Sequence, residues 1–96
     1  MRQYELVLVL RPDLEDELIE RTLERVGNAI RNTGGEVTQT DHWGRRRLAY
    51  PIDRQMEGYY VVEQLRLDGQ QASSVEGSVR LTEEIMRHLL VRKDEA

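Results

Sequence analysis

The chain has 96 residues, a formal net charge of −4 and no cysteine, so it is long enough for one modest hydrophobic core and contains no disulfide, zinc–thiolate site or cysteine nucleophile. Its apolar run Leu6–Leu10 is far shorter than the ~20 residues of a membrane-spanning helix, and no signal-peptide core precedes it. We therefore expect a cytoplasmic protein, mature as written. Its isoelectric point near 5.2 is unlike the values above ~9 that are typical of nucleic-acid-binding domains.

The first third of the chain predicts a strand and then a long helix. Residues 2–10 alternate between two sides that both carry apolar side chains, which is typical of a central strand. Apolar side chains then recur at three- and four-residue steps from Leu14 to Ile30. This spacing predicts an amphipathic helix of about 17–20 residues, with one apolar face for the core.

The sequence also indicates where this helix begins and ends. Asp13 and Asp16 are spaced as a capping pair directly after Pro12, and acidic residues fill the first turn, where they complement the helix dipole. Gly34 and Gly35 follow the last apolar residue, and glycine often ends a helix. The helix is therefore expected to begin at Asp13 and to stop before Gly34.

Residues 36–67 predict two strands of a hairpin. Residues 36–50 are β-like, and Pro51 is expected to end this strand because the residue before a proline prefers extended geometry. Residues 59–67 are the next strand. The polar stretch 54–58 is expected to connect the two strands as a loop, in place of a tight two-residue turn.

The last part of the chain predicts a weak helix and a final strand. Residues 69–81 place apolar side chains at helical spacing but include serines and glycines of poor helix propensity, with Asp68 as the expected N-cap. Residues 84–92 read as the fourth strand. Residues 93–96 are expected to be a frayed tail.

The predicted element order is β-α-β-β-α-β, within a single domain that spans residues 1–96. Right-handed crossovers place both helices on one face of a four-stranded antiparallel sheet. This is the ferredoxin-like split βαβ arrangement, an α+β fold. The opposite sheet face remains uncovered, and we expect partners to bind there.

Charge is distributed unevenly along the chain. Residues 13–25 contain six acids and two bases, a local charge of −4, whereas residues 41–54 contain four arginines and two aspartates, a local charge of +2. Screening confines each field to about 8–10 Å at ordinary salt. An anion can therefore be attracted to the second region although the chain as a whole is acidic.

Three consecutive arginines, Arg45, Arg46 and Arg47, form the centre of the basic region. In a strand, Arg46 points away from the other two, so the triplet cannot form one cluster on one face. One interpretation is phosphate binding by the planar guanidinium groups; the other is an edge strand protected by charge from pairing with other edges. Trp43 and Tyr50 flank the triplet and either stack on an unpaired base or a partner side chain, or pack within the hairpin.

Other candidate sites are few. Asp41 and His42 are adjacent in a strand, so they point to opposite faces and cannot chelate one metal ion. His88 has no ligand partner near it in the sequence and is interpreted as a histidine satisfied within the fold. Glu63 alternates with apolar residues and either pairs with a basic group or lies where the sheet opens to water. The chain lacks a nucleophile-elbow serine and a glycine-rich phosphate loop, and it predicts no catalytic residue, no metal site, no cofactor and no enzyme.

Several short motifs occur along the whole chain. They are Arg2, Tyr4 and Glu5; Gly34-Gly35; Gly44; Arg46-Arg47-Leu48-Ala49-Tyr50-Pro51-Ile52; Gly58-Tyr59; and Arg80, Arg87 and Val91-Arg92. With these motifs the chain resembles the ribosomal protein six family of the bacterial small subunit. The resemblance implies a structural, non-enzymatic, ribosome-associated protein with the fold described above. It also implies binding to the central domain of the small-subunit ribosomal RNA as a pair with ribosomal protein eighteen.

The resemblance also suggests which residues bind RNA. It implies this role for Arg46 and Arg47 of the motif, and Arg2, Arg87 and Arg92 are further basic candidates. Arg45 is added to these candidates, although it is not characteristic of the family. Trp43 and Tyr50 are candidates for partner contact or stacking. Glu63 departs from the apolar or aromatic residue expected at its position.

Electrostatics suggests an order of assembly. RNA affinity rises with the number of phosphates neutralised, so a few arginines on a chain of net charge −4 are expected to bind weakly alone. A basic partner would supply the missing charge and be attracted by the acidic surfaces. We therefore expect a monomer when free, which pairs with protein eighteen first and binds RNA second.

Two other functions remain as alternatives. A dimeric small-molecule sensor would pair through the exposed sheet face, but it leaves the arginine triplet unexplained. An acyl-phosphate hydrolase would need an arginine cradle beside an asparagine that orients water. Asn28 and Asn32 lie on the first predicted helix without such a loop, so this alternative ranks last.

Overall fold

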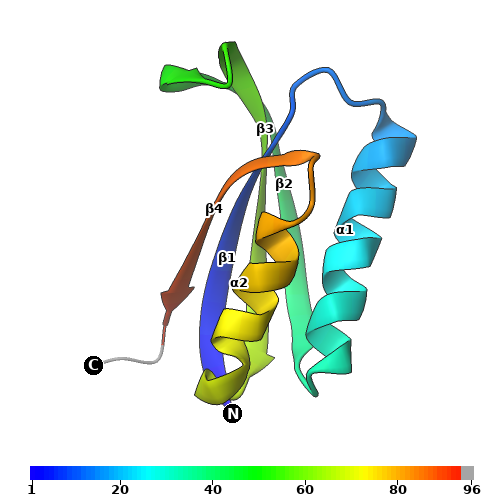
Figure 1. The fold of residues 1–96 in the computed structure, drawn as a ribbon, viewed down its shortest axis with the longest axis vertical. Helices are drawn as coiled ribbons and strands as arrows, with labels where there is room; N and C mark the ends of the chain where they lie inside the picture. Colours follow the sequence, from blue (N-terminus) through cyan, green and yellow to red (C-terminus); the bar gives the residue numbers. More distant parts are fainter. Residues whose placement is uncertain (94–96) are drawn as a thin grey trace.

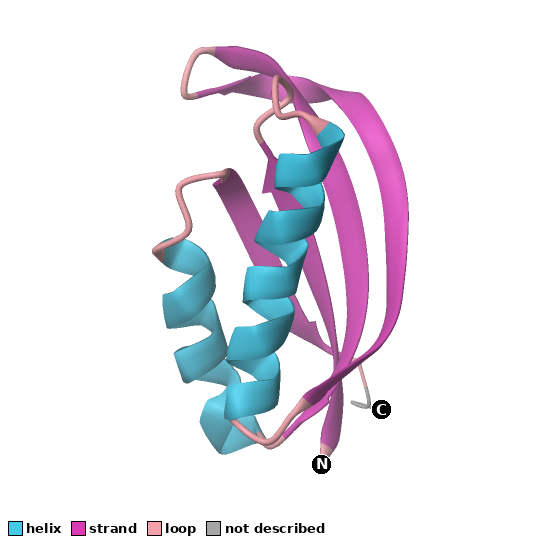
Figure 2. Cartoon of the chain, turned by 90° about the vertical axis from the view of Figure 1, so that its right-hand side faces the viewer, coloured by secondary structure: helices cyan, strands magenta, loops and turns pink. Residues whose placement is uncertain are grey.

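The computed structural model describes residues 1–93, which form a four-stranded sheet with its helices on one face (Figures 1 and 2). The elements in chain order are β1 (Arg2–Leu10), α1 (Asp16–Asn32), β2 (Glu36–Ile52), β3 (Gln55–Leu67), the 3₁₀ turn η1 (Gly69–Gln71), α2 (Ala72–Arg80) and β4 (Ile85–Arg92). All neighbouring strands are antiparallel, in the spatial order β2-β3-β1-β4. The predicted ferredoxin-like fold is therefore confirmed, with β1 central and β2 at an edge. Within the described residues, no helix is long and apolar enough to cross a membrane.

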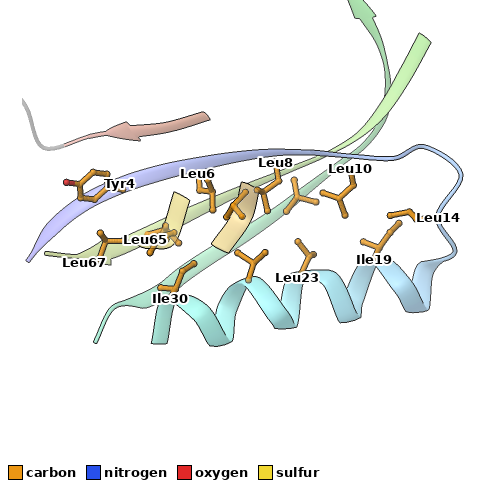
Figure 3. Packing of buried hydrophobic residues seen from close by; sticks show 14 residues of the cluster. Tyr4, Leu6, Leu8, Leu10, Leu14, Ile19, Leu23, Ile30, Leu65 and Leu67 are labelled. Carbon is orange, nitrogen blue, oxygen red and sulfur yellow. The ribbon is translucent and has the colours of Figure 1, made fainter. Parts of the chain in front are cut away.

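The hydrophobic core lies between the sheet and the helices (Figure 3). Leu6, Leu8 and Leu10 of β1 point toward the helices and are fully buried. Helix α1 places its apolar stripe, including Ile19 and Ile30, against them. Because a strand alternates its side chains, the odd-numbered residues of β1 face the other side of the sheet, which no helix within residues 1–93 covers (Figure 2).

Helix α1 begins later than the sequence predicts. Pro12 and Asp13 form a turn, and the helix starts at Asp16, with Glu15 as the N-cap and no side-chain capping bond. The prediction that Asp13 and Asp16 form a capping pair is therefore wrong, whereas the observed helix length of 17 residues agrees with the predicted 17–20. At the other end the helix stops at Asn32, and Gly34 adopts a left-handed φ of 89°, as expected for a helix-ending glycine.

The β2–β3 hairpin is longer and tighter than predicted. Strand β2 continues through Pro51 to Ile52, and β3 already begins at Gln55. Asp53 and Arg54 alone form the turn, with φ values of 49° and 65°. Positive φ at both central residues matches the twist of a two-residue hairpin. The predicted loop over residues 54–58 is therefore wrong, and proline is tolerated in β2 because this strand lies at an edge.

The final third agrees more closely with expectation. The predicted helix divides into η1 and the shorter α2, and Asp68 occupies the N-cap position of η1 without a side-chain capping bond. Strand β4 begins at Ile85, one residue later than predicted. Lys93 follows the end of β4 and remains attached to β1, because its backbone N–H donates to the Gln3 carbonyl (2.8 Å). The remaining residues of the predicted frayed tail, 94–96, lie outside the described residues.

Candidate functional site

A large bulge in β2 shapes the open sheet face near the hairpin. Arg47 pairs with Glu57 and Ile52 with Gln55, so the four residues Leu48–Pro51 lie opposite a single residue of β3. A bulge bends its strand and redirects its side chains. Here it carries the Leu-Ala-Tyr-Pro motif toward the open face.

Tyr50 of this bulge contacts β4 on the far side of the sheet. The Arg87 guanidinium donates a hydrogen bond to the Tyr50 hydroxyl. Its central carbon also lies 5.8 Å from the centre of the Tyr50 ring, a cation–π contact. The two side chains thus connect the extended hairpin, which projects beyond the other strands in Figure 1, to the opposite edge of the sheet.

Beneath this connection the open face is hollowed and apolar. The hollow has a volume of about 390 Å³. It is lined by Val7, Val9, Leu48, Ala49, Tyr50, Ile52, Tyr60, Arg87 and Leu89. We refer to the region lined by these residues as the open-face hollow. Leu89 leaves 58% of its surface exposed there. The sequence predicted that this face is uncovered and that partners bind there, but it did not predict the hollow, because the walls of the hollow come from all four strands.

Gly58 permits the close approach of the hairpin to β1. A Cβ atom at this position would lie 2.4 Å from Cγ1 of Val9, closer than real carbon atoms approach. Any larger residue would push β3 and the side chains around the hollow apart. Gly58 also lies in register with Arg46, so no cross-strand side chain competes with that arginine.

The arginine triplet alternates between the two faces as predicted. Arg45 lies on the helix side, where its Nε donates to the Pro12 carbonyl (2.7 Å) and its Nη2 to the Leu14 carbonyl (3.2 Å). Its guanidinium also lies over the Tyr59 ring at 5.7 Å. Arg45 therefore ties the segment before α1 to β2, a role that its sequence context did not suggest.

Arg46 points to the opposite side and lies over Trp43. Its central guanidinium carbon is 5.1 Å from the centre of the indole ring. Trp43 occupies a second bulge, between His42 and Gly44, and leaves 51% of its surface exposed. Arg47 lines a separate depression of about 380 Å³, together with Pro12 of the segment before α1 and residues 54–57 of the hairpin.

The other predicted RNA-binding arginines are not gathered at one place. Arg87 lies in the hairpin half of the sheet, opposite Val9. Arg2, opposite Leu67, and Arg92, opposite Tyr4, lie at the other end of the sheet. The structure therefore brings together the arginines of the hairpin and Arg87 in one half of the sheet, and separates them from Arg2 and Arg92.

Two titratable residues that the sequence analysis discussed, Glu63 and His88, make contacts within the fold. Glu63 is 2% exposed within the core, and its Oε2 accepts a hydrogen bond from the Thr40 hydroxyl (3.2 Å), whereas Oε1 has no hydrogen-bond partner in the described part of the chain. Burial raises the pKa of Glu63 to about 7, against the lowering effect of the Thr40 bond. It thus neither pairs with a basic group nor opens to water. His88 is satisfied as predicted, by Glu76 of α2 (3.1 Å).

His42 and Asp41 also follow the expected alternation. His42 lies in register with Val61 on the helix side and is hydrogen-bonded through Nδ1 to the Tyr59 hydroxyl (2.9 Å). Asp41 lies in register with Val62 on the open side. Among residues 1–93, no group of three or more histidine or acidic side chains is placed to hold a metal ion.

The fold and this surface define a small ferredoxin-like protein with an apolar sheet face and an arginine-rich hairpin, a combination suited to binding macromolecules. The sequence matches the family model of ribosomal protein S6 over residues 3–92. The chain belongs to the ribosomal protein S6 family. It is therefore of a structural, non-enzymatic class, a component of the bacterial small ribosomal subunit, and ribosome-associated in the cytoplasm.

Curated relatives and a solved structure agree with this assignment. The small ribosomal subunit protein bS6 of Carboxydothermus hydrogenoformans is 39% identical over 98% of both chains. The bS6 protein of Thermoanaerobacter pseudethanolicus is 41% identical, over 99% of this chain and 100% of its own. The crystal structure of 30S ribosomal protein S6 from Thermotoga maritima superposes with a TM-score of 0.89 at 33% identity, over 96% of this chain and 87% of that chain.

Proposed function

We propose that this chain binds the central domain of the small-subunit ribosomal RNA together with ribosomal protein eighteen, and that the two proteins pair before they bind RNA. The observation that carries the proposal is the open-face hollow, which lies beside the arginines of the β2–β3 hairpin. An apolar concave surface suits a protein partner, and guanidinium groups suit phosphate oxygens. The role is architectural and requires no chemistry from the chain.

The open-face hollow supports the protein-partner part of the proposal. Leu89 and Val91 of β4 are exposed on this face, and Tyr50, which lines the hollow with Leu89, is more than half exposed. Burying such side chains against a partner removes apolar surface from water, which contributes roughly 25 cal/mol per Å². At the rim, one N–H of the Arg87 guanidinium already donates to the Tyr50 hydroxyl, and this hydrogen bond can remain when a partner closes the hollow.

Charge supports the order of assembly. The chain carries a net charge of −4, and residues 13–25 alone contribute a local −4. Arg46 and Arg47 can neutralise only a few phosphates, so the affinity of the isolated chain for RNA is expected to be low. A basic protein eighteen would add positive charge, and the acidic surface of this chain would speed their encounter.

Filter binding tests the proposal. A central-domain fragment of the ribosomal RNA is titrated with this chain, with protein eighteen and with both, each at a low and a high salt concentration. The expected result is tight, salt-sensitive binding only when both proteins are present. Equal affinity of the chain with and without its partner would contradict the pairing step.

Absence of RNA binding under every condition would contradict the proposal as a whole. The size-exclusion mass of the free chain at micromolar concentration then distinguishes the alternatives. Our proposal expects a monomer. A stable homodimer, formed through the same apolar face, would favour the dimeric small-molecule sensor instead.

A further inference from the structure

Trp43 is an exposed aromatic residue that the fold does not use. It is the single tryptophan of the chain, and half of its surface remains in contact with solvent. The register of β2 against β3 skips from His42 to Gly44, so Trp43 has no residue opposite it. Large aromatic side chains dominate the energetics of cores and interfaces, and Trp43 contributes little to this core.

Arg46 supports the Trp43 ring from one side. The guanidinium lies 5.1 Å from the ring centre, and the residue opposite Arg46 is Gly58, which has no side chain to displace it. Within residues 1–93, no acidic side chain pairs with Arg46. The positive charge of the guanidinium is thus held next to an exposed indole without being neutralised.

The space around this pair is open. Gly44, which directly follows Trp43, has a φ of 83°, and a Cβ atom at this position would meet nothing within 4 Å. A flat ligand can therefore approach the backbone beside Trp43 at Gly44 without displacing a side chain at that position. The geometry favours a planar group that carries a negative charge close to its ring.

We propose that Trp43 and Arg46 form a stacking site for one unpaired RNA base, with the Arg46 guanidinium also contacting the phosphate of that nucleotide. This inference rests on the proposed function. Base stacking on aromatic rings is a common means of binding single-stranded RNA, and arginine binds phosphate through its planar fork. The site lies in the region of local charge +2 and outside the apolar hollow, which favours a nucleotide over a protein segment as its occupant.

Three variants test the site in the complete assembly. Trp43→Leu removes the ring, Trp43→Phe keeps an aromatic face as a matched control, and Arg46→Ala removes the guanidinium. With protein eighteen present, Trp43→Leu is expected to weaken binding to the central-domain RNA about 5- to 100-fold. Trp43→Phe keeps an aromatic ring, so its affinity for the RNA should remain close to that of wild type. Arg46→Ala should weaken binding and reduce the slope of log affinity against log salt by about one, whereas Trp43→Leu should leave the slope nearly unchanged.

A spectroscopic measurement reports on the ring directly. Because Trp43 is the single tryptophan of the chain, the difference in emission between wild type and Trp43→Phe, each paired with protein eighteen, isolates its fluorescence. Adding RNA to the protein pair should quench this signal. In the same comparison made on the free chains, adding protein eighteen without RNA should leave the Trp43 emission unchanged. Thermal melts of all three variants check that the fold is intact.

Two results would overturn the inference while leaving the proposed function in place. One is wild-type RNA affinity for Trp43→Leu. The other is a loss of affinity of Trp43→Leu for protein eighteen in the absence of RNA, which would make Trp43 a protein contact. If the wild-type pair does not bind RNA at all, the proposed function fails and the inference fails with it.

Discussion

The two faces of the sheet use the same strands for different purposes. On the helix side, Leu6, Leu8 and Leu10 are fully buried. On the open side, the intervening Val7 and Val9 line the hollow together with Leu89, which is more than half exposed. Neighbouring residues of one strand thus contribute to stability on one face and to a binding surface on the other. The comparison predicts that substitutions on the two faces separate stability from binding.

The largest effect on stability is expected at Leu8. Leu8→Ala removes a fully buried side chain and leaves a cavity, which should lower the free energy of unfolding by about 2–5 kcal/mol. Leu89→Ala on the open face is the matched control and should cost less than about 1 kcal/mol. Urea denaturation measures both. Equal losses in the free energy of unfolding would mean that Leu89 on the open face stabilises the fold as much as Leu8 on the helix face.

Glu63 is expected to make stability depend on pH. The pKa of Glu63 is about 7 in the folded protein, whereas an ordinary, solvent-exposed glutamate has a pKa of 4.5. Above pH 7 the carboxylate is charged in both states, and its burial costs about 3 kcal/mol. As pH falls from 7 to 4.5, the folded protein holds a proton that the unfolded chain releases, so this group makes the fold more stable at lower pH.

Glu63→Met should remove this contribution. The variant is expected to be more stable than wild type at about pH 8 and to lose most of that advantage at about pH 5, because methionine has no charge to bury. Urea midpoints at the two pH values measure the difference. A difference between variant and wild type that does not change with pH would show that Glu63 is not the titrating group.

Two neighbouring arginines of β2 are expected to differ in the same way, one in stability and the other in RNA binding. Arg45→Ala loses hydrogen bonds to the Pro12 and Leu14 carbonyls and should destabilise the fold by about 1 kcal/mol. Arg46→Ala should change stability by less than about 0.5 kcal/mol. RNA affinity should show the opposite order, with a larger loss for Arg46→Ala than for Arg45→Ala. Thermal melts together with filter binding test this, and an RNA defect confined to Arg45→Ala would reverse the assignment.

Much of the fold follows from periodicity. The alternation in residues 2–10 and the helical spacing from Leu14 to Ile30 record which side of each element is buried, so β1 and α1 were predictable. The tight turn was not, because Asp53 and Arg54 adopt positive φ without glycine. Its geometry depends on the pairing of two long strands, which local propensity does not contain.

The charged residues of the site could be predicted from the sequence, but the shape of the surface could not. The triplet of arginines is visible in the sequence, and strand alternation correctly separates Arg46 from Arg45. The contact of Tyr50 with Arg87 joins residues 37 positions apart, and it depends on the bulge before Ile52. A bulge of this size has no reliable local pattern, so the hollow emerges only when all four strands are in place.

The most direct test of the division between the two faces is the affinity for protein eighteen of Leu89→Gln and Leu81→Gln. Leu89 lies in the open-face hollow, whereas Leu81, which is 86% exposed, lies at the end of α2 and does not line it. Calorimetric titration should find a large loss of affinity for Leu89→Gln and none for Leu81→Gln, with both melting temperatures close to wild type. Wild-type affinity of Leu89→Gln for protein eighteen would show that the open-face hollow is not the partner's binding surface.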